Sequence, residues 1–148
     1  MSSDIKYELV DRIDVNELMA FYNAQGCVMP QSVDKLSKMI DNSVCFVTAR
    51  DSNGQVIGIA RGVADGLRGY LTECKLDPAV QGPGAVTHID GRIEHDQYGI
   101  ARQMAEHVIQ ALANLGCERI DAYAYGTEVD FCEELGFKKL RGLVAMEL

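Results

Sequence analysis

Proline is scarce in this sequence, tryptophan is absent, and no apolar run is long. The 148 residues include three prolines, and 47% of all residues are hydrophobic while 24% are charged. This composition excludes collagen-like, low-complexity and disordered chains. No stretch approaches the ~18 uninterrupted apolar residues of a membrane span, and the segment after Met1 lacks the basic and apolar regions of a secretory signal. We therefore expect a cytoplasmic protein with one domain over residues 1–148 and no membrane partner.

Positively charged residues are also fewer than negatively charged ones. Lysine and arginine total 14 against 22 aspartates and glutamates, which gives a formal net charge of −8. Nucleic-acid-binding proteins normally carry a basic stripe that neutralises phosphates, and the sequence has none, so no nucleic-acid partner is expected. The net negative field weakly favours cationic partners such as amines. The longest basic cluster, at residues 138–141, is interpreted as the solvated edge of a strand.

The cysteines lack the spacing of a disulfide framework or a zinc site. They are Cys27, Cys45, Cys74, Cys117 and Cys132. Because their number is odd and no two are spaced C-x-x-C, reduced thiols are expected. His88 and His95 lie on a predicted hairpin whose strand pairing puts neither opposite the other, which favours an exposed polar hairpin over a metal site. We therefore expect no metal.

The first half of the chain predicts a strand, two helices and a meander of three strands. Asp14 followed by Glu17 is typical of a capping box that begins a helix, and Ser32 can cap a second one. Asn53 and Gly54 favour a tight turn, because this pair tolerates positive φ. The expected strands cover residues 5–10, 44–49, 55–61 and 70–76, with a further turn at 65–69.

The second half contains the clearest amphipathic helix, over residues 99–115. Its apolar residues recur at spacings of three and four, and Gly116 is a typical helix end. A strand over 119–125 follows, then a short helix capped by Thr127 and a final strand over 137–148. This order of strands and helices indicates an α+β (mixed α/β) fold with helices on the faces of a sheet.

Four segments resemble motifs of one enzyme family. The runs Q-V-I-G-I-A-R at 55–61 and Y-L-T-E-C-K-L-D-P-A-V-Q at 70–81 are similar to two central strands of the GNAT superfamily of acyl-CoA-dependent N-acetyltransferases. F-C-E-E-L-G-F at 131–137 resembles the superfamily's "F-Y-E-K-L-G-F", and F-Y-N-A-Q-G at 21–26 fits a small-acetyltransferase subgroup. The resemblance implies a central mixed, mostly antiparallel sheet of six to seven strands flanked by about four helices. It also implies acetyl-CoA as co-substrate.

The family loop that cradles the CoA pyrophosphate is interrupted in this chain. Gln81 stands at the first position of the loop, but the matching glycine is Gly99, and residues 82–96 are an insertion of fifteen residues. Placing Asp96 first instead would bring a carboxylate beside the pyrophosphate, so Gln81 is preferred. An Asp-Gly pair in the insertion predicts a hairpin, which needs a surface to pack on. The candidates are bound CoA, the chain's own sheet or a second subunit, and we favour the second subunit and hence a homodimer.

The long helix begins directly after a glycine, and the free N–H groups and positive dipole end of a helix bind anions. The resemblance implies that the pyrophosphate lies there, with pantetheine along the preceding strand. The implied cofactor-binding residues are Cys74, Lys75 and Leu76 on the strand, with Gln81, Tyr98, Gly99, Ile100, Ala101 and Arg102 around the loop and helix start.

Glu73 is the best candidate for a general base, because the resemblance places a carboxylate there near the acetyl acceptor. An alkylammonium must lose a proton before it attacks a thioester, and a partly desolvated carboxylate can take that proton. The alternative is a surface carboxylate on a strand edge. Asp65 could hold the amine as a counter-ion, although plain turn chemistry is favoured for it. Tyr22, in the N-terminal motif, is a further candidate for substrate binding.

The family tyrosine that protonates the departing CoA thiolate falls at Cys132 in this chain. A thiol can donate a proton, since its unperturbed pKa is about 8.5 against about 10 for tyrosine. A buried cysteine, however, usually acts as a small apolar residue. Tyr125 and Tyr123, on the preceding predicted strand, are alternative donors.

The sequence thus predicts an N-acetyltransferase that moves an acetyl group from acetyl-CoA to a primary amine by direct transfer. The interrupted loop and the missing tyrosine leave two alternatives open, a non-catalytic GNAT-like CoA-binding module and a protein-interaction module. The acceptor is a small-molecule amine or an amine of a protein or peptide. Its contacts come from variable segments such as residues 23–31 and the insertion.

Overall fold

The computed structural model describes residues 4–24, 32–80 and 98–148. These residues form a five-stranded sheet whose strands lie side by side in chain order. The first four strands pair antiparallel, and the last two pair in parallel. The predicted α+β fold with a mostly antiparallel sheet is therefore confirmed. The strands are β1 (Lys6–Val10), β2 (Cys45–Arg50), β3 (Val56–Ala64), β4 (Arg68–Leu76) and β5 (Arg119–Ala122).

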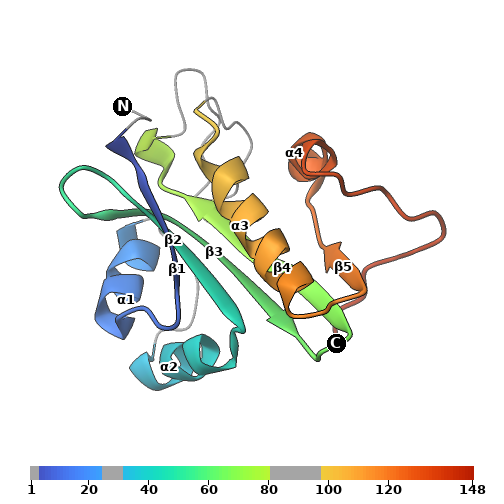
Figure 1. Ribbon diagram of the computed structural model, residues 1–148, viewed down its shortest axis with the longest axis horizontal. Coiled ribbons are helices and arrows are strands. Elements are labelled where there is room, and N and C mark those ends of the chain that lie inside the picture. The colour runs from blue at the N-terminus through green and yellow to red at the C-terminus, as the bar shows by residue number, and fades with distance from the viewer. Residues whose placement is uncertain (1–3, 25–31, 81–97) are drawn as a thin grey trace.

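Four α-helices accompany the sheet within the described residues. They are α1 (Val15–Ala24), α2 (Val33–Asn42), α3 (Ile100–Asn114) and α4 (Val129–Glu134), with short 3-10 helices η2 (Pro78–Val80) and η3 (Gly126–Glu128). Figure 1 shows α3 running along β4 in front of the sheet, α1 and α2 at its other side, and α4 above β5. None of the helices in this part of the chain has the length and apolarity needed to cross a membrane.

Both predicted helix caps near the N-terminus are present. The Asp14 carboxylate accepts from the backbone N–H of Glu17 at 3.0 Å, and the Ser32 hydroxyl accepts from the N–H of Lys35 at 3.1 Å. These side chains satisfy backbone donors that a helix start leaves without intrahelical acceptors. The Glu17 side chain does not complete a capping box, because it forms an ion pair with Arg50 on β2 instead.

α3 connects the parallel strands β4 and β5, as a crossover between parallel strands requires. It begins after Gly99, whose φ is +71°, and ends before Gly116, whose φ is +92°. Glycine adopts both left-handed conformations without the steric cost that a Cβ would impose. The amphipathic helix expected over residues 99–115 is confirmed.

The two faces of the sheet carry two separate cores. The first lies between α3 and the sheet, and its largest fully buried side chains are those of Val47, Leu76, Met104, Val108 and Leu112. The second lies between the opposite face and the helices α1 and α2, and it contains Leu18, Phe21, Leu36, Phe46 and Ile59. β2 and β3 therefore send side chains into both cores, as the central strands of a sheet covered on both sides do.

The pairing of β3 with β4 contains a bulge at Thr72. Arg61 pairs with Glu73, but the next pair is Gly62 with Leu71, so Thr72 is an extra residue on β4. A bulge interrupts the alternation of side chains between the two faces of a sheet. Two residues that are two positions apart across the bulge therefore point to opposite faces. Leu71 belongs to the core under α3, whereas Glu73 contacts α1 on the other face.

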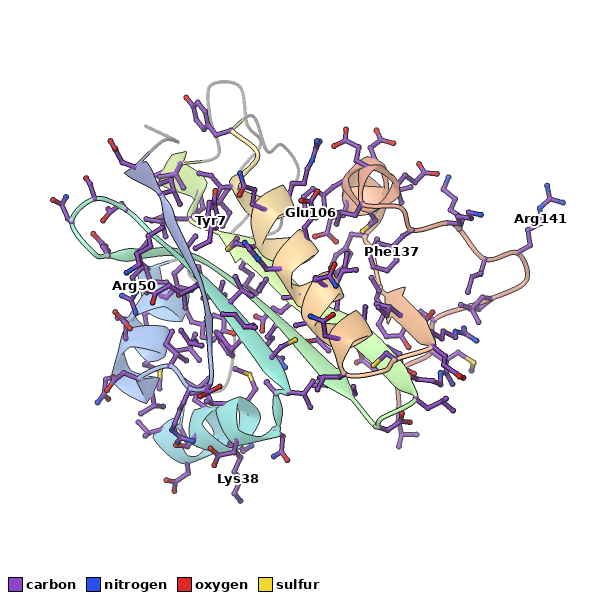
Figure 2. The ribbon with its side chains drawn as sticks, viewed as in Figure 1. Tyr7, Lys38, Arg50, Glu106, Phe137 and Arg141 are labelled. Atoms are coloured by element: carbon purple, nitrogen blue, oxygen red, sulfur yellow. The ribbon has the colours of Figure 1, made fainter. Side chains whose placement is uncertain are left out.

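The predicted strand count of six to seven is too high, because the described residues form five strands. Residues 137–148 form no strand, so the basic cluster at 138–141 lies in an exposed segment and not on a strand edge. Gly142 has a left-handed φ of +76°, which strands do not use, and this divides the segment into short pieces. Figure 2 shows Arg141 projecting from the resulting loop.

Two further boundaries differ from the prediction. β5 ends at Ala122 and not at residue 125, because the chain turns into η3 at Gly126. Thr127 lies inside η3, and Glu128 occupies the N-cap position of α4. The end of α4 is as predicted, since Gly136 follows it with a φ of +104°.

Candidate functional site

The candidate site lies where β4 and β5 separate. The two parallel strands pair from Arg68 with Arg119 to Leu71 with Ala122, where β5 ends. β4 continues beyond that last pair through Leu76, so its second half runs past the end of its neighbour. Figure 1 shows this divergence between the two arrows. An extended ligand can add to a strand at such a place through backbone hydrogen bonds.

The N-terminus of α3 lies beside the same half of β4. The Cys74 thiol contacts the carbonyl oxygen of Ala101 at 3.5 Å, which brings predicted cofactor residues of the strand and of the helix together. Among the described residues, no atom would lie within 4 Å of a Cβ built on Gly99. The first turn contains no acidic residue. This helix start therefore has the backbone donors and the dipole that receive a phosphate.

The remaining predicted cofactor residues differ in what they can offer. Leu76 is fully buried, so only its backbone can face a ligand. Lys75 pairs with Ile59 of β3, and Tyr98 lies before the helix with 38% of its surface exposed. Arg102 forms an ion pair with Glu134, which joins the first turn of α3 to α4.

Glu73 lies at the centre of a part-buried polar cluster. The Tyr22 hydroxyl donates to the Glu73 carboxylate, with both oxygens at 2.8 Å, and Nε of Arg61 donates to Oε2 at 2.7 Å. The side chains of Glu73 and Arg61 are 8% and 14% exposed. The structure thus brings the predicted base and the predicted substrate residue Tyr22 into direct contact. It also shows that Glu73 is not a surface carboxylate.

The pKa of Tyr22 is raised far above its ordinary value. Burial is the largest cause, because it disfavours the phenolate, and the negative charge of Glu73 adds to it. Tyr22 therefore keeps its proton and acts as a hydrogen-bond donor to Glu73. Its hydroxyl cannot act as the proton source for a departing thiolate without giving up that contact.

The candidate general acids lie on and before α4. Cys132 is half-buried on α4, and burial, followed by the charge of Glu128, raises the pKa of its thiol. Tyr125 and Tyr123 lie between β5 and α4 and are 59% and 78% exposed. The backbone N–H of Tyr125 donates to the Glu128 carboxylate at 2.9 Å.

Asp65 lies away from Glu73, in the turn that joins β3 to β4. Its carboxylate accepts from the backbone N–H groups of Arg68 at 2.8 Å and Leu67 at 2.9 Å, and these bonds lower its pKa. Leu67 in turn accepts from Glu118, which follows the C-terminal end of α3. The turn therefore lies at the opposite end of β4 from the start of α3, and the contacts of Asp65 are those of turn chemistry.

Several predictions lie outside the described residues. Gln81, the hairpin at 82–96 with its two histidines, and most of the acceptor segment at 23–31 belong to this group. Within the described ranges, no group of three or more histidine, cysteine, aspartate or glutamate side chains could hold a metal ion.

Arg61 is the member of the cluster around Glu73 that sequence reasoning missed. Counting back from the turn that joins β3 and β4 pairs Arg61 with Thr72, which puts Glu73 opposite Ala60. The bulge shifts the pairing by one residue and places Arg61 opposite Glu73. The sequence did place an arginine and a glutamate on neighbouring predicted strands, which indicates a possible ion pair. It contained no pattern that indicates the bulge.

A separate hollow of about 840 Å³ lies between β5, α4 and the C-terminal segment. Cys132, Tyr123 and Asp121 line it, together with Phe137 and Val144. Of the predicted cofactor residues that the structure describes, none lines this hollow.

No family model matches the chain, and no curated protein matches it. Solved structures do match. A GNAT-family acetyltransferase from Streptococcus pneumoniae is 17% identical, with 97% of this chain and 98% of that chain covered at a TM-score of 0.67. Glucosamine-6-phosphate N-acetyltransferase from Arabidopsis thaliana is 8% identical, with 96% and 98% covered at 0.68. The protein AAC(6')-Iy, solved with the bisubstrate analogue CoA-S-monomethyl-acetylneamine, is 13% identical, with 97% of each chain covered at 0.69.

Proposed function

We propose that this chain, which has the fold of the GNAT acetyltransferases, is an acetyl-CoA-dependent N-acetyltransferase. The observation that carries the proposal is the divergence of β4 from β5 directly beside the N-terminus of α3. One place thus offers a strand for an amide-containing chain and a helix start for a phosphate. Coenzyme A contains both groups, joined in one molecule.

Acetyl-CoA would bind along the second half of β4. Pantetheine would lie against the backbone of Cys74, Lys75 and Leu76, and the pyrophosphate would face the N–H groups from Gly99 to Arg102. The fit is supported by the absence of an acidic side chain from the first turn of α3 and, among the described residues, of any atom within 4 Å of a Cβ built on Gly99. The contact between Cys74 and Ala101 supports the continuity of the two halves of this site.

Glu73 would act as the general base of a direct transfer. The acceptor amine attacks the acetyl carbonyl, a C–N bond forms, and the nitrogen gives up a proton to Glu73, directly or through water. The C–S bond breaks, and the CoA thiolate receives a proton from Cys132 or Tyr125. None of the cysteines needs to form a covalent bond to the acetyl group.

The binding step is tested at Gly99 with two matched substitutions. Gly99→Glu and Gly99→Gln impose the same strain at a left-handed φ and have nearly the same size, but only glutamate adds a negative charge. We expect CoA to bind the wild type in calorimetry and to bind Gly99→Glu roughly tenfold more weakly than Gly99→Gln, because like charges repel at the helix start. Equal affinities of the two variants would move the phosphate elsewhere, and no CoA affinity in the wild type would refute the proposal.

Turnover separates the enzyme from the two alternatives. A protein that binds CoA but releases no thiol from acetyl-CoA with any amine would be a non-catalytic CoA-binding module. One that does not bind CoA would be an interaction module. The amine panel should include a hexosamine phosphate and an aminoglycoside, since structural neighbours are named for these acceptors or carry an analogue of one. A peptide with a free α-amino group and a lysine completes it.

A further inference from the structure

The cluster around Glu73 connects three separate elements. Tyr22 comes from α1, Arg61 from β3 and Glu73 from β4, and the three side chains meet on the face of the sheet opposite α3. Tyr22 is 2% exposed and packs in the second core. The two charged side chains are nearly as well enclosed. Such a cluster is costly to bury unless its groups pair with one another, and these groups do.

The contacts fix the carboxylate in one orientation. A glutamate side chain has several rotatable bonds, so an unpaired carboxylate samples many positions. In this structure the Tyr22 hydroxyl lies at 2.8 Å from both oxygens and Arg61 holds Oε2 at 2.7 Å. A carboxylate offers about four lone-pair sites, so these two donors leave capacity for a further hydrogen. That remaining capacity is what a general base needs.

The two donors are themselves fixed. The raised pKa of Tyr22 keeps its phenol protonated, and the guanidinium of arginine is always charged in proteins. Arg61 also lies on β3 directly opposite Glu73, so the backbone pairing of the sheet sets the distance between them. Neither partner can leave the carboxylate through a change in its own protonation at ordinary pH.

The cluster around Glu73 lies next to the place where β4 and β5 separate. The last pair of β4 with β5 is at Leu71, the bulge follows at Thr72, and Glu73 is the first residue beyond it. We propose that Tyr22 and Arg61 are positioning residues that hold Glu73 at the point where β4 leaves β5, ready to accept the proton of the amine. This inference rests on the proposed function, and it assigns to Tyr22 a role through Glu73 and not through the substrate.

A double-mutant cycle tests this role. The variants are Tyr22→Phe, Glu73→Gln and the two combined, with kcat and both KM values measured on one active amine. Tyr22→Phe removes only the hydroxyl and keeps the buried ring, and we expect kcat to fall roughly 10- to 100-fold because the base is no longer held in place. The KM for acetyl-CoA should not change. In the Glu73→Gln background the same substitution should cost nothing further, because the group that it positions has already lost its function.

Arg61 is tested with a charge-retaining and a charge-removing substitution. Arg61→Lys keeps the positive charge but loses the fixed geometry of the guanidinium, whereas Arg61→Gln loses the charge as well. We expect kcat to fall in both variants and to fall further in Arg61→Gln, because Arg61→Lys still places a positive charge beside the carboxylate, while the KM for acetyl-CoA stays unchanged. Tyr70→Phe, a β4 tyrosine outside the cluster, is the matched control and should retain wild-type kinetics.

The outcomes are distinguishable. An equal loss from Tyr22→Phe in both backgrounds, or no loss in the active wild-type background, overturns the positioning role and leaves the acetyltransferase function intact. A wild type that releases no thiol with any amine refutes the proposed function and this inference together. Circular dichroism and melting temperature of each variant separate these results from unfolding, and Tyr22→Phe remains informative if the Arg61 variants do not fold.

Discussion

Cys132 illustrates how the environment of a residue changes its chemistry. By sequence it replaces the tyrosine of a resembling motif, and an ordinary thiol is a stronger acid than a phenol. In the structure, burial and the charge of Glu128 raise the pKa of Cys132, which brings its acidity nearer to that of a tyrosine. A half-buried thiol on α4 is therefore a better mimic of the missing group than the residue type alone indicates.

The same shift predicts slow alkylation. Thiolates react with iodoacetamide and thiols do not, so Cys132 should react more slowly at pH 7.5 than a free cysteine and should still gain rate near pH 9. Cys45, whose pKa is raised by burial, should behave in the same way. Peptide-resolved mass spectrometry measures each site separately. Modification of Cys132 at the rate of free cysteine would contradict the assigned environment.

The ion pair between Glu17 and Arg50 makes the stability of the fold depend on pH. The Arg50 guanidinium donates to both carboxylate oxygens of Glu17, at 2.6 and 2.8 Å, and these bonds hold the pKa of Glu17 below its ordinary value of 4.5. Since the folded-state pKa is the lower one, the pair contributes fully above that ordinary value. The contribution is lost as the pH falls through the folded-state pKa.

We expect Glu17→Gln to lower the free energy of unfolding by about 0.5–1 kcal/mol at pH 7, a modest figure because both side chains are partly exposed and screened by solvent. The difference from the wild type should shrink toward zero at pH 3. Urea unfolding at the two pH values measures it. Glu106→Gln, at an exposed position of α3, is the matched control, and an equal effect at both pH values would exclude the ion pair as the cause.

At the scale of the elements, α3 approaches the sheet closely because two strands carry glycine beneath it. A Cβ on Gly62 of β3 would stand 3.0 Å from the Sγ of Cys45, 3.0 Å from Val108 and 3.2 Å from Leu112. All three neighbours are buried, so none can move into solvent. The helix and the strand can therefore pack at this distance only while residue 62 has no side chain.

Gly62→Ala should consequently lower the free energy of unfolding by about 1–3 kcal/mol through overpacking. Gly126→Ala is the control, because a Cβ there would have no atom of the described residues within 4 Å, and it should change stability by less than about 1 kcal/mol. Denaturant unfolding of both variants provides the comparison. If the two substitutions cost the same, contact between α3 and β3 is looser than the structure indicates.

The elements that were predicted correctly are those with local signals. Asp14 and Ser32 cap helices through bonds to residues three positions away, and the spacing of apolar residues in α3 is a property of that helix alone. The turn at Asn53 and Gly54 likewise needs only two residues. Such features depend on short segments, so sequence reasoning recovered the order of strands and helices as far as α4. The place expected for CoA came from the family resemblance and stays a prediction.

The features that were missed depend on residues distant in the sequence. A strand over 137–148 needs a neighbouring strand, and the left-handed Gly142 prevents the continuous extension that its apolar residues indicated. The contact of Tyr22 with Glu73 joins residues 51 positions apart. The pairing of Arg61 with Glu73 depends on a bulge that no local sequence pattern indicates. The candidate base could therefore be named from the sequence, but its contacts with Tyr22 and Arg61 could not.

At the scale of the whole molecule, we expect the insertion of residues 82–96 to take part in the assembly of two subunits. The prediction that it forms a dimer arm lies outside the described residues and rests on its Asp-Gly turn and its apolar residues. Replacing residues 82–96 with a short Gly-Ser link should leave the circular dichroism spectrum essentially unchanged and shift the mass in sedimentation toward the monomer. The same mass for both proteins would favour a role of the insertion over the cofactor instead.

The extra residue in β4 has a consequence for how this chain can change through evolution. Thr72 is the residue that lets Leu71 and Glu73, two positions apart, emerge on opposite sides of the sheet, whatever its side chain. Exchanging it for another residue keeps the bulge, whereas an in-frame loss of one codon there would restore strict alternation. Leu71 and Glu73 would then be neighbours in the strand and would still point to opposite faces, so Glu73 would stay on the side of Tyr22 and Arg61. In genetic terms, the side on which the acid emerges tolerates both substitution and deletion at this position, so it depends on neither the identity nor the presence of residue 72.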